Sequence, residues 1–179
     1  MEFAKTSEGH EQRIVDLFTT TFTESEGVDE GVLIGRLVRR QMTETAPEDI
    51  SVFVAEEQGE LAGAVVFSRM TYSADPRTVW LLSPMAVATG RQGEGIGQAL
   101  LRHALQDLRE GGADVAVTYG DPAFYGKVGF VPVSERMVPA PQPLSQPGGW
   151  LALSLSAAVL TPLRGTGSCI AALNDPAFW

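Results

Sequence analysis

The chain has 179 residues, a length close to that of one compact domain, and 44% of them are hydrophobic, so it can bury a core without disulfides or metal ions. Its formal net charge of −9 repels phosphate backbones and anionic lipid headgroups, which disfavours nucleic acid and membrane partners. We therefore expect one domain over residues 1–179 whose partners are small molecules or proteins.

The number of cysteines and the length of apolar runs indicate in which cellular compartment the protein is expected. Cys169 is the only cysteine, which excludes an internal disulfide framework and a cysteine-rich zinc site. No apolar run near Met1 resembles a signal peptide, and the apolar stretch over 151–160 is too short to span a bilayer. These features predict a cytoplasmic protein with no metal site.

The first part of the chain is predicted to form a short strand and two amphipathic helices. Ser7 can cap the first helix, in which apolar residues over 14–22 recur at helical spacing. The same spacing recurs over 33–38. The acidic segment 24–30 joins the two helices, and we expect it to be a solvated loop.

A β-rich region follows, interrupted by a helix. In chain order we predict strands over 50–56, 61–72 and 78–88, a helix over 97–110, a strand over 115–117, a short helix at 123–125 and closing strands over 150–156 and 168–173. Gly59 suits a tight hairpin turn between the first two strands. Four prolines within residues 139–147 predict a surface excursion, because proline removes a backbone donor.

Glycines at positions 93, 95 and 97 lie between a predicted strand and a predicted helix. Such a turn lets backbone N–H groups approach an anion and adds the helix dipole, so it predicts a phosphate-binding site. A nucleoside-triphosphate loop would need Gly-Lys-Ser/Thr, whereas Gly95 is followed by Ile96 and Gly97. A dinucleotide-binding turn would place its third glycine one residue later. ATP hydrolysis and nicotinamide cofactors are therefore disfavoured.

The Gln-x-x-Gly-x-Gly pattern of Gln92, Gly95 and Gly97 resembles the acetyl-CoA signature of the Gcn5-related N-acetyltransferase (GNAT) family. Residues 121–130, Asp-Pro-Ala-Phe-Tyr-Gly-Lys-Val-Gly-Phe, are similar to the family's second signature and to a bacterial subgroup with Gly-Asp-Pro-Ala-Phe-Tyr. The resemblance extends over residues 1 to about 135. It implies an α/β (α+β) fold: a single domain with a mixed, mostly antiparallel central sheet of about six to seven strands flanked by about four helices.

The resemblance also implies a function and a site. The implied reaction is transfer of an acetyl group from acetyl-CoA to an amine of a small molecule or protein, by direct attack. In the family the strand before the glycine turn splays from its neighbour and contacts the pantetheine arm, and Pro84 can assist by lacking an N–H donor. The implied cofactor-binding residues are Met85, Ala86, Val87, Gln92, Gly93, Glu94, Gly95, Ile96, Gly97, Asp121 and Tyr125.

Two positions depart from the family pattern. Glu94 stands where lysine or arginine is frequent, so a carboxylate would lie near the diphosphate unless it points into solvent. Asp121 stands where many members have an asparagine that contacts the pantetheine arm, which leaves its role open.

Acetyl transfer to an amine needs a neutral amine, a donor to the developing oxyanion and a proton for the leaving thiolate. The resemblance makes Tyr125 the catalytic general acid, because an oriented and partly desolvated phenol can protonate a thiolate. The spacing marks no general base. Glu24, Glu26 and Ser83 are candidates, and some family members rely on water relays and positioning instead.

Two other hypotheses stay open. A non-catalytic acyl-CoA sensor or partner-binding domain would keep the phosphate site without a productive acceptor site. A phosphate-binding or nucleotide-binding protein of unrelated fold would bind ATP more tightly than coenzyme A. The acceptor depends on the loops at 24–30 and 139–150 and not on the fold, and an exposed strand over 150–156 could pair across a homodimer.

Overall fold

The computed structural model describes residues 1–6 and 9–179. They form two compact units, residues 1–67 with 84–104 and residues 68–83 with 105–179. Strand β3 (Glu60–Tyr72), strand β4 (Asp75–Val87) and helix α3 (Ile96–Glu110) contribute residues to both units. One domain over residues 1–179 stays a prediction.

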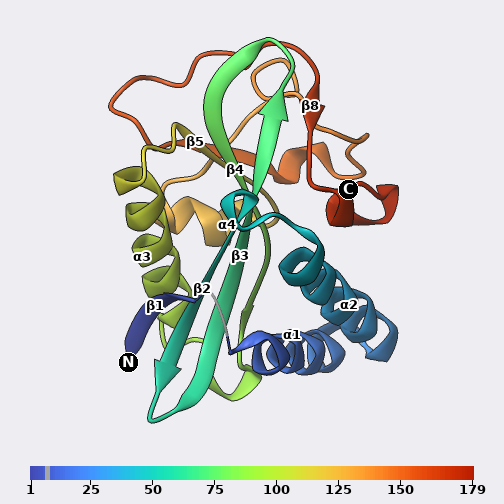
Figure 1. Ribbon diagram of the computed structural model, residues 1–179, viewed down its shortest axis with the longest axis vertical. Helices are drawn as coiled ribbons and strands as arrows, with labels where there is room; N and C mark the ends of the chain where they lie inside the picture. Colours follow the sequence, from blue (N-terminus) through green and yellow to red (C-terminus); the bar gives the residue numbers. More distant parts are fainter. Residues whose placement is uncertain (7–8) are drawn as a thin grey trace. The chain divides into compact units, whose positions relative to one another are not determined.

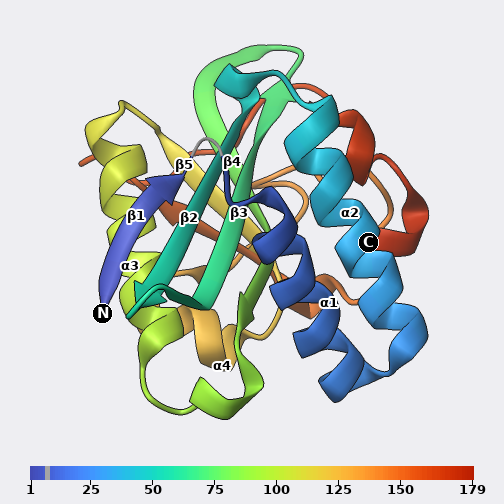
Figure 2. The ribbon, with the colours of Figure 1, turned by 60° about the horizontal axis from the view of Figure 1, so that its bottom comes forward.

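Two long helices, α1 (Glu11–Glu26) and α2 (Val28–Glu44), lie side by side in the first unit (Figures 1 and 2). They are separated by Gly27 alone, whose φ is 104°. The prediction of a loop over residues 24–30 is therefore wrong. The acidic residues Asp29 and Glu30 fall in the first turn of α2, where the helix dipole stabilises negative charge.

The two helices pack closely because Gly31 and Gly35 of α2 face Thr19 and Thr23 of α1, and a Cβ at either glycine would overlap a threonine side chain. The helical spacing of apolar residues is confirmed, since its members form the buried faces of both helices. The predicted cap of α1, Ser7, lies outside the described residues.

The first unit also contains a group of paired strands. Strand β1 (Glu2–Thr6) is antiparallel to β2 (Ile50–Glu57), and β3 pairs with β2 on its other side. The predicted hairpin turn between β2 and β3 is confirmed. It contains Gln58 and Gly59, both with positive φ (53° and 84°), as the tightest β-hairpins require.

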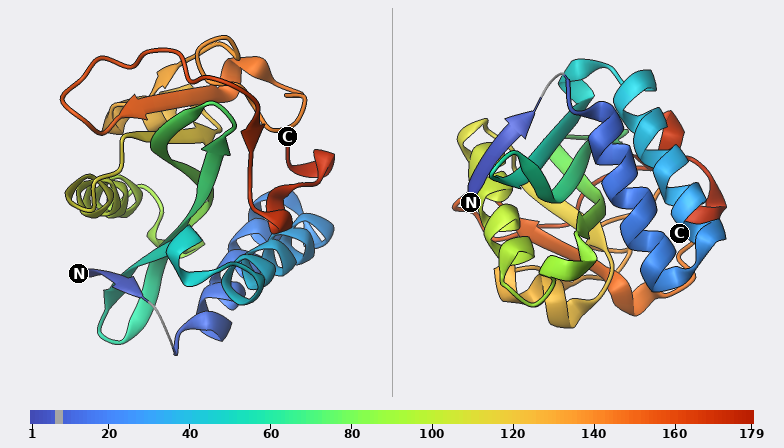
Figure 3. Two further views of the ribbon diagram at one scale, coloured as in Figure 1. Left: turned by 45° about the horizontal axis from the view of Figure 1, so that its top comes forward. Right: turned by 90° about the horizontal axis from the view of Figure 1, so that it is seen from below.

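Helices cover both faces of these strands, as Figure 3 shows in its right panel. The ring of Phe53 on β2 lies 6.1 Å from the ring of His103 on α3. Its neighbour Val52 points to the opposite face, where it lies with Ile14 of α1 and Met42 of α2. The alternation of side chains along β2 therefore directs α1 and α2 to one face and the first part of α3 to the other.

The second unit is built around β5 (Val115–Tyr119). It is parallel to β4, from Val79↔Val115 to Leu82↔Thr118. On its other side β5 is antiparallel to β7 (Trp150–Ser154), and β7 pairs with β6 (Val131–Pro132) (Figure 3, left).

The fold class is confirmed. The strand order is β1-β2-β3-β4-β5-β7-β6, with β8 (Gly167–Ser168) on β3, and the described residues contain four α-helices. The sheet has eight strands rather than the six or seven expected. The count includes β6 and β8, which are only two residues long and therefore leave little pattern in the sequence. A closing strand over 168–173 is wrong. Ala171–Leu173 is a 3₁₀ turn, and a short apolar run lacks the periodicity that separates strand from helix.

No helix in the described part of the chain is long and apolar enough to cross a membrane. Likewise, residues 1–6 and 9–179 contain no cluster of three or more His, Cys, Asp or Glu side chains that could hold a metal ion.

Candidate functional site

The glycine-rich turn joins β4 to α3 within the first unit. After β4 ends, the 3₁₀ turn Thr89–Arg91 leads to Gly93 and Gly95, whose φ angles are 84° and 81°. Glycine adopts such angles at little cost. A Cβ built at either glycine would meet no atom within 4 Å, so the turn leaves open space beside its backbone.

The start of α3 offers free backbone donors. Its first hydrogen bond runs from Ala99 N–H to the carbonyl oxygen of Gly95 over 3.1 Å. The N–H groups of Ile96, Gly97 and Gln98 therefore have no acceptor within the helix. Together with the positive end of the helix dipole, they can bind an anion. Ile96 and Gly97 are buried, which fixes the position of this helix end.

Gln92 holds the turn to the strand. Its side-chain Nε2 donates a hydrogen bond of 3.1 Å to the carbonyl oxygen of Val87, the last residue of β4. The amide of Gln92 is thus engaged within the turn itself, and we interpret Gln92 as a residue that shapes the anion site.

The carboxylate of Glu94 is paired with a cation. Arg91 Nε donates to both oxygens of Glu94, at 3.0 and 2.9 Å, and Arg91 Nη2 donates to Glu57 Oε2 at 3.0 Å. The hydrogen bond to Glu94 is the main cause that raises the pKa of Arg91. The Glu94 side chain is 46% exposed, so it points toward Arg91 and solvent. Sequence reasoning missed Arg91, although it directly precedes Gln92.

The end of β4 is a candidate surface for an extended ligand. Its register with β5 runs only as far as Leu82↔Thr118, while β4 itself continues to Val87. Within this extension Met85 and Val87 are half-buried, whereas Ala86 is buried. The backbone of this stretch therefore continues past the last residue that pairs with β5, and the splay stays a prediction.

The second signature lies in the second unit, at the end of β5. Helix α4 (Pro122–Tyr125) is capped by Asp121, whose Oδ1 accepts a hydrogen bond of 2.8 Å from Ala123 N–H. The Tyr125 ring is half-buried and packs edge-on against Phe130, at 5.8 Å between ring centroids. A Cβ at Gly120 would lie 2.6 Å from Cε2 of Tyr125, so only glycine admits this ring position. Sequence reasoning missed this contact, because spacing does not show it.

The surroundings of Tyr125 keep its hydroxyl protonated. Burial raises the pKa of Tyr125, a hydrogen bond with Thr118 opposes the shift, and the charge of Asp121 adds to it. Thr118 Oγ1 also donates a hydrogen bond of 3.2 Å to the carbonyl oxygen of Leu82. With a pKa above its ordinary value of about 10, the phenol holds its proton at neutral pH.

The predicted site residues fall into two groups. The first unit brings together Met85, Ala86, Val87, Gln92, Gly93, Glu94, Gly95, Ile96 and Gly97, and the second unit holds Asp121 and Tyr125. Of the candidate bases, Glu24 and Glu26 are exposed on α1, and Ser83 is half-buried on β4. Nothing in their positions singles out one of them as a base.

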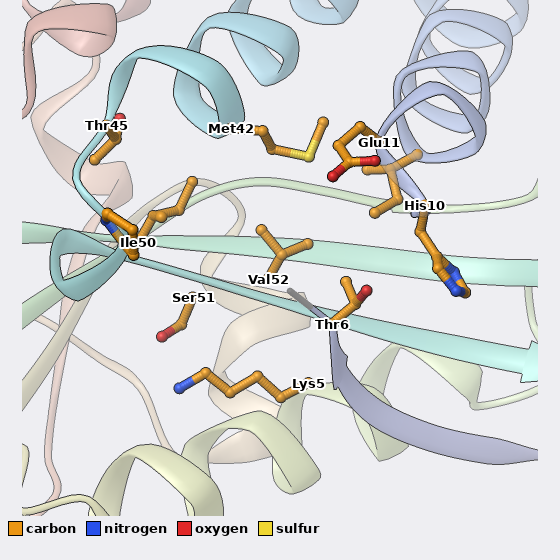
Figure 4. Close-up of a pocket in the computed structure, with 11 residues that line it drawn as sticks. Lys5, Thr6, His10, Glu11, Met42, Thr45, Ile50, Ser51 and Val52 are labelled. Carbon is orange, nitrogen blue, oxygen red and sulfur yellow. The ribbon is translucent and has the colours of Figure 1, made fainter. Parts of the chain in front are cut away.

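One pocket of the first unit lies apart from these residues (Figure 4). It has a volume of about 190 Å³ and is lined by residues of β1, β2, α1, α2 and the segments beside them. Its lining contains His10, whose buried Nδ1 has no hydrogen-bond partner among the described residues. Ligand pockets usually measure about 300–1,000 Å³. This pocket is smaller and contains no predicted site residue, so it is a poor candidate for the functional site.

Comparison with protein families gives a match at residues 48–132 to the acetyltransferase (GNAT) domain. Among curated proteins, the uncharacterized N-acetyltransferase YjhQ of Escherichia coli K12 is 30% identical over 113 residues, which are 60% of this chain and 62% of YjhQ. The uncharacterized N-acetyltransferase YhbS of the same strain is 30% identical over 81 residues, 45% of this chain and 48% of YhbS. The chain thus matches about half to three fifths of the length of these relatives.

Solved structures with the same fold extend over nearly the whole chain. E. coli YhbS in complex with CoA has a TM-score of 0.79 at 19% identity, covering 97% of this chain and 92% of YhbS. A GNAT family acetyltransferase from Brucella melitensis in complex with acetyl-CoA has a TM-score of 0.73 at 24% identity, covering 96% and 98%. The family match, the curated relatives and the shared fold agree with both sequence signatures and support assignment of the chain to the GNAT acetyltransferase family.

Proposed function

We propose that the protein is an N-acetyltransferase that binds acetyl-CoA at the glycine turn and acetylates an amine of a small molecule or protein. The observation that carries this proposal is the open turn at Gly93 and Gly95, followed by the free N–H groups at the start of α3. Relatives named N-acetyltransferases, and neighbours solved with CoA or acetyl-CoA, support it.

The residues of the first unit fit the anionic part of the cofactor. A diphosphate would accept hydrogen bonds from the N–H groups of Ile96, Gly97 and Gln98, as anions do at helix N-termini. Arg91 supplies a nearby cation, which compensates the charge of Glu94. The backbone of residues 85–87 offers amide groups that can pair with the uncharged amides of the pantetheine arm.

The chemistry divides between cofactor and protein. When bound, acetyl-CoA supplies a thioester: the amine nitrogen bonds to the acetyl carbon, the C–S bond breaks, and an N-acetyl amide and a free thiol result. The acceptor must first lose a proton to solvent to be a nucleophile, and we assign no residue to that step. The Tyr125 hydroxyl, kept protonated by its surroundings, holds the proton that the departing sulfur needs. The extra proton on the nitrogen then passes to solvent and the Tyr125 phenolate takes up a proton from solvent, so no net charge accumulates.

Calorimetric titration with acetyl-CoA, with ATP and NAD as controls, tests the cofactor. We expect micromolar binding of acetyl-CoA and none of the controls at the same concentration. Gly95→Glu should abolish binding, because its side chain would fill the open turn with a carboxylate. Gly112→Glu is the matched control: Gly112 also has positive φ (85°) and no atom within 4 Å of a Cβ, but lies beyond the other end of α3. Equal losses in both variants would contradict the assigned site.

Tyr125→Phe distinguishes an enzyme from a non-catalytic acyl-CoA sensor. We expect cofactor affinity to stay within about threefold and thiol release in the presence of amines to fall by about 100-fold, the lower end of the effect of a general acid. A wild-type protein that binds acetyl-CoA but acetylates no amine would favour the sensor. A cytoplasmic location, the absence of nucleic acid and membrane partners, and a homodimer remain predictions.

A further inference from the structure

A second pocket, entirely within the second unit, lies beside the Tyr125 segment. Its volume is about 680 Å³, within the usual range of ligand pockets. The lining comes from three stretches: residues 119–122 at the end of β5, residues 145–149 before β7, and residues 177–179. The middle stretch belongs to the proline-rich excursion, one of the two loops on which the acceptor was expected to depend.

Hydrogen bonds fix the walls of this pocket. Gly120 N–H donates to the carbonyl oxygen of Gly149 at 2.9 Å. The Tyr119 hydroxyl accepts a hydrogen bond of 2.5 Å from Gln146 N–H and shares one of 3.1 Å with Ser145 Oγ. The loop before β7 is thus attached to the end of β5 by several hydrogen bonds of the chain itself.

Aromatic rings support one side of the pocket. Tyr119 stacks on Trp179 with 6.4 Å between ring centroids, and Trp150 packs against Trp179 at 5.9 Å. Both indole N–H groups are satisfied, by the carbonyl oxygens of Val138 and Leu173. The rings of Tyr119, Phe178 and Trp179 are part of the lining. Aromatic faces attract cations, whereas they offer nothing to a carboxylate.

The charge of the lining has one sign. Asp121 is the one charged side chain among the eleven lining residues, and none of them is a lysine or arginine. One of its oxygens accepts the cap hydrogen bond from Ala123, which leaves the other free for a ligand. The pantetheine arm of coenzyme A has no cation to pair with this carboxylate, and its phosphates would be repelled. A positively charged ligand fits.

Gly120 connects the pocket to the proposed acid. It lines the pocket, and a Cβ built on it would lie 2.6 Å from Cε2 of Tyr125. Gly120 therefore lies beside both the pocket and the Tyr125 ring.

We propose that this pocket is the acceptor site and that it takes a small amine bearing positive charge and no acidic group, with Asp121 as its specificity-determining residue. The inference rests on the proposed acetyltransferase function. It extends that function by assigning the acceptor's chemical class, and it gives Asp121 a role toward the acceptor instead of the cofactor.

Three acceptors of one length test the proposal: 1,3-diaminopropane, 3-amino-1-propanol and β-alanine differ only in a terminal ammonium, hydroxyl or carboxylate. We expect kcat/KM to fall in that order with saturating acetyl-CoA. Asp121→Asn should reduce the preference for the diamine over the amino alcohol by about tenfold, the size of one charge-assisted hydrogen bond. The variant should fold, because an asparagine oxygen can still accept from Ala123 N–H.

Asp175→Asn is a matched control. Asp175 also begins an Asp-Pro-Ala-Phe stretch and accepts a hydrogen bond of 2.9 Å from Ala177 N–H, but it does not line the pocket. It should leave the preference unchanged. Tryptophan fluorescence during titration with the diamine alone gives a second readout through Trp179, and Asp121→Asn should weaken the titration.

Each outcome decides for or against the pocket. Turnover of β-alanine equal to or above that of the diamine overturns the inference, as does an unchanged preference in Asp121→Asn. Failure to acetylate the diamine while other amines react overturns the inference and leaves the proposed function standing. Loss of acetyl-CoA binding in the wild type overturns the proposed function instead.

Discussion

At the residue scale, Glu94 is the position where this chain departs most clearly from the family's glycine turn. Its carboxylate pairs with Arg91, yet both side chains are partly exposed, 46% and 35%. Such an exposed pair contributes little to stability. The main effect of Glu94 is therefore expected on ligand binding, where a negative charge beside an anionic ligand is unfavourable.

Glu94→Lys should tighten acetyl-CoA binding by about 5- to 10-fold at physiological salt. It replaces a repulsive charge with an attractive one and frees Arg91 from its pairing with Glu94, and both changes are screened by solvent and salt. Calorimetry measures the effect. Glu48→Lys is the control, because it changes the net charge by the same amount. Glu48 lies just before the start of β2, about 25 Å along the strand from Glu57, the residue at the end of β2 that pairs with Arg91. An equal gain in that control would mean that only overall charge matters.

Gly120 is a second residue at which a substitution is expected to change activity, because its lack of a side chain leaves room for the Tyr125 ring. Gly120→Ala should force the Tyr125 ring to move, since the added Cβ would lie 2.6 Å from Cε2. A displacement of about 1 Å at a reacting group can lower kcat by about 100-fold, and we expect a loss of at least tenfold with cofactor affinity retained. Gly126→Ala is the control, because Gly126 also neighbours Tyr125 but has open space at its Cβ position. Normal turnover in Gly120→Ala would remove Tyr125 from the mechanism.

At the scale of elements, the sequence predicted what periodicity and turn chemistry determine. The apolar stripes of α1 and α2, the helix α3 and the β2–β3 turn at Gly59 all follow from local pattern. The predictions failed where contacts between distant residues determine the local conformation. Residues 24–30 are mostly helical because α1 and α2 are packed together through Gly31 and Gly35, and no composition rule shows such packing.

The site shows the same division. The open glycine turn is a local feature, and its residues were predicted from spacing. Arg91, which pairs with both Glu94 and Glu57, was missed because Glu57 lies 34 positions away. The pocket beside Gly120 was missed because it unites three distant stretches of chain.

The hairpin of β3 and β4 holds a partly buried ion pair that stabilises the second unit. The Asp75 side chain is 2% exposed and accepts hydrogen bonds from Arg77 Nε and Nη2, at 2.9 and 2.8 Å. It also accepts one of 3.1 Å from Arg164 N–H, which attaches the segment before β8. The hydrogen bond from Arg77 holds the pKa of Asp75 well below its usual range.

Asp75→Asn should lower the free energy of unfolding by about 3 kcal/mol at pH 7, because it leaves Arg77 without its charged partner. Since the folded pKa of Asp75 is depressed, its contribution is present above the unfolded pKa of about 3.9 and is lost as pH falls through the folded pKa. Urea unfolding at several pH values should therefore show the difference from wild type shrinking below about pH 4. Glu44→Gln, which removes an exposed ion pair with Arg40, should cost less than about 0.5 kcal/mol. Similar effects of both substitutions would contradict the special role of Asp75.

At the scale of the whole molecule, the net charge of −9 opposes the approach of an anionic cofactor. Binding of acetyl-CoA must then come from the local donors of the glycine turn. Because a ligand that binds only the folded state stabilises it by mass action, acetyl-CoA at about 100 times its Kd should add about 2.7 kcal/mol. For a chain of this length that corresponds to a rise in Tm of about 5–10 °C.

This rise separates a local site from a general effect of added nucleotide. Differential scanning fluorimetry should show it for the wild type and for Gly112→Glu, but not for Gly95→Glu, whose added carboxylate occupies the open turn. ATP at the same concentration should leave Tm unchanged, because the turn lacks the lysine and hydroxyl that hold a triphosphate. An equal rise with ATP would mean that the turn recognises phosphate groups without regard to the rest of the ligand, and the glycine turn alone would then be insufficient evidence for acetyl-CoA.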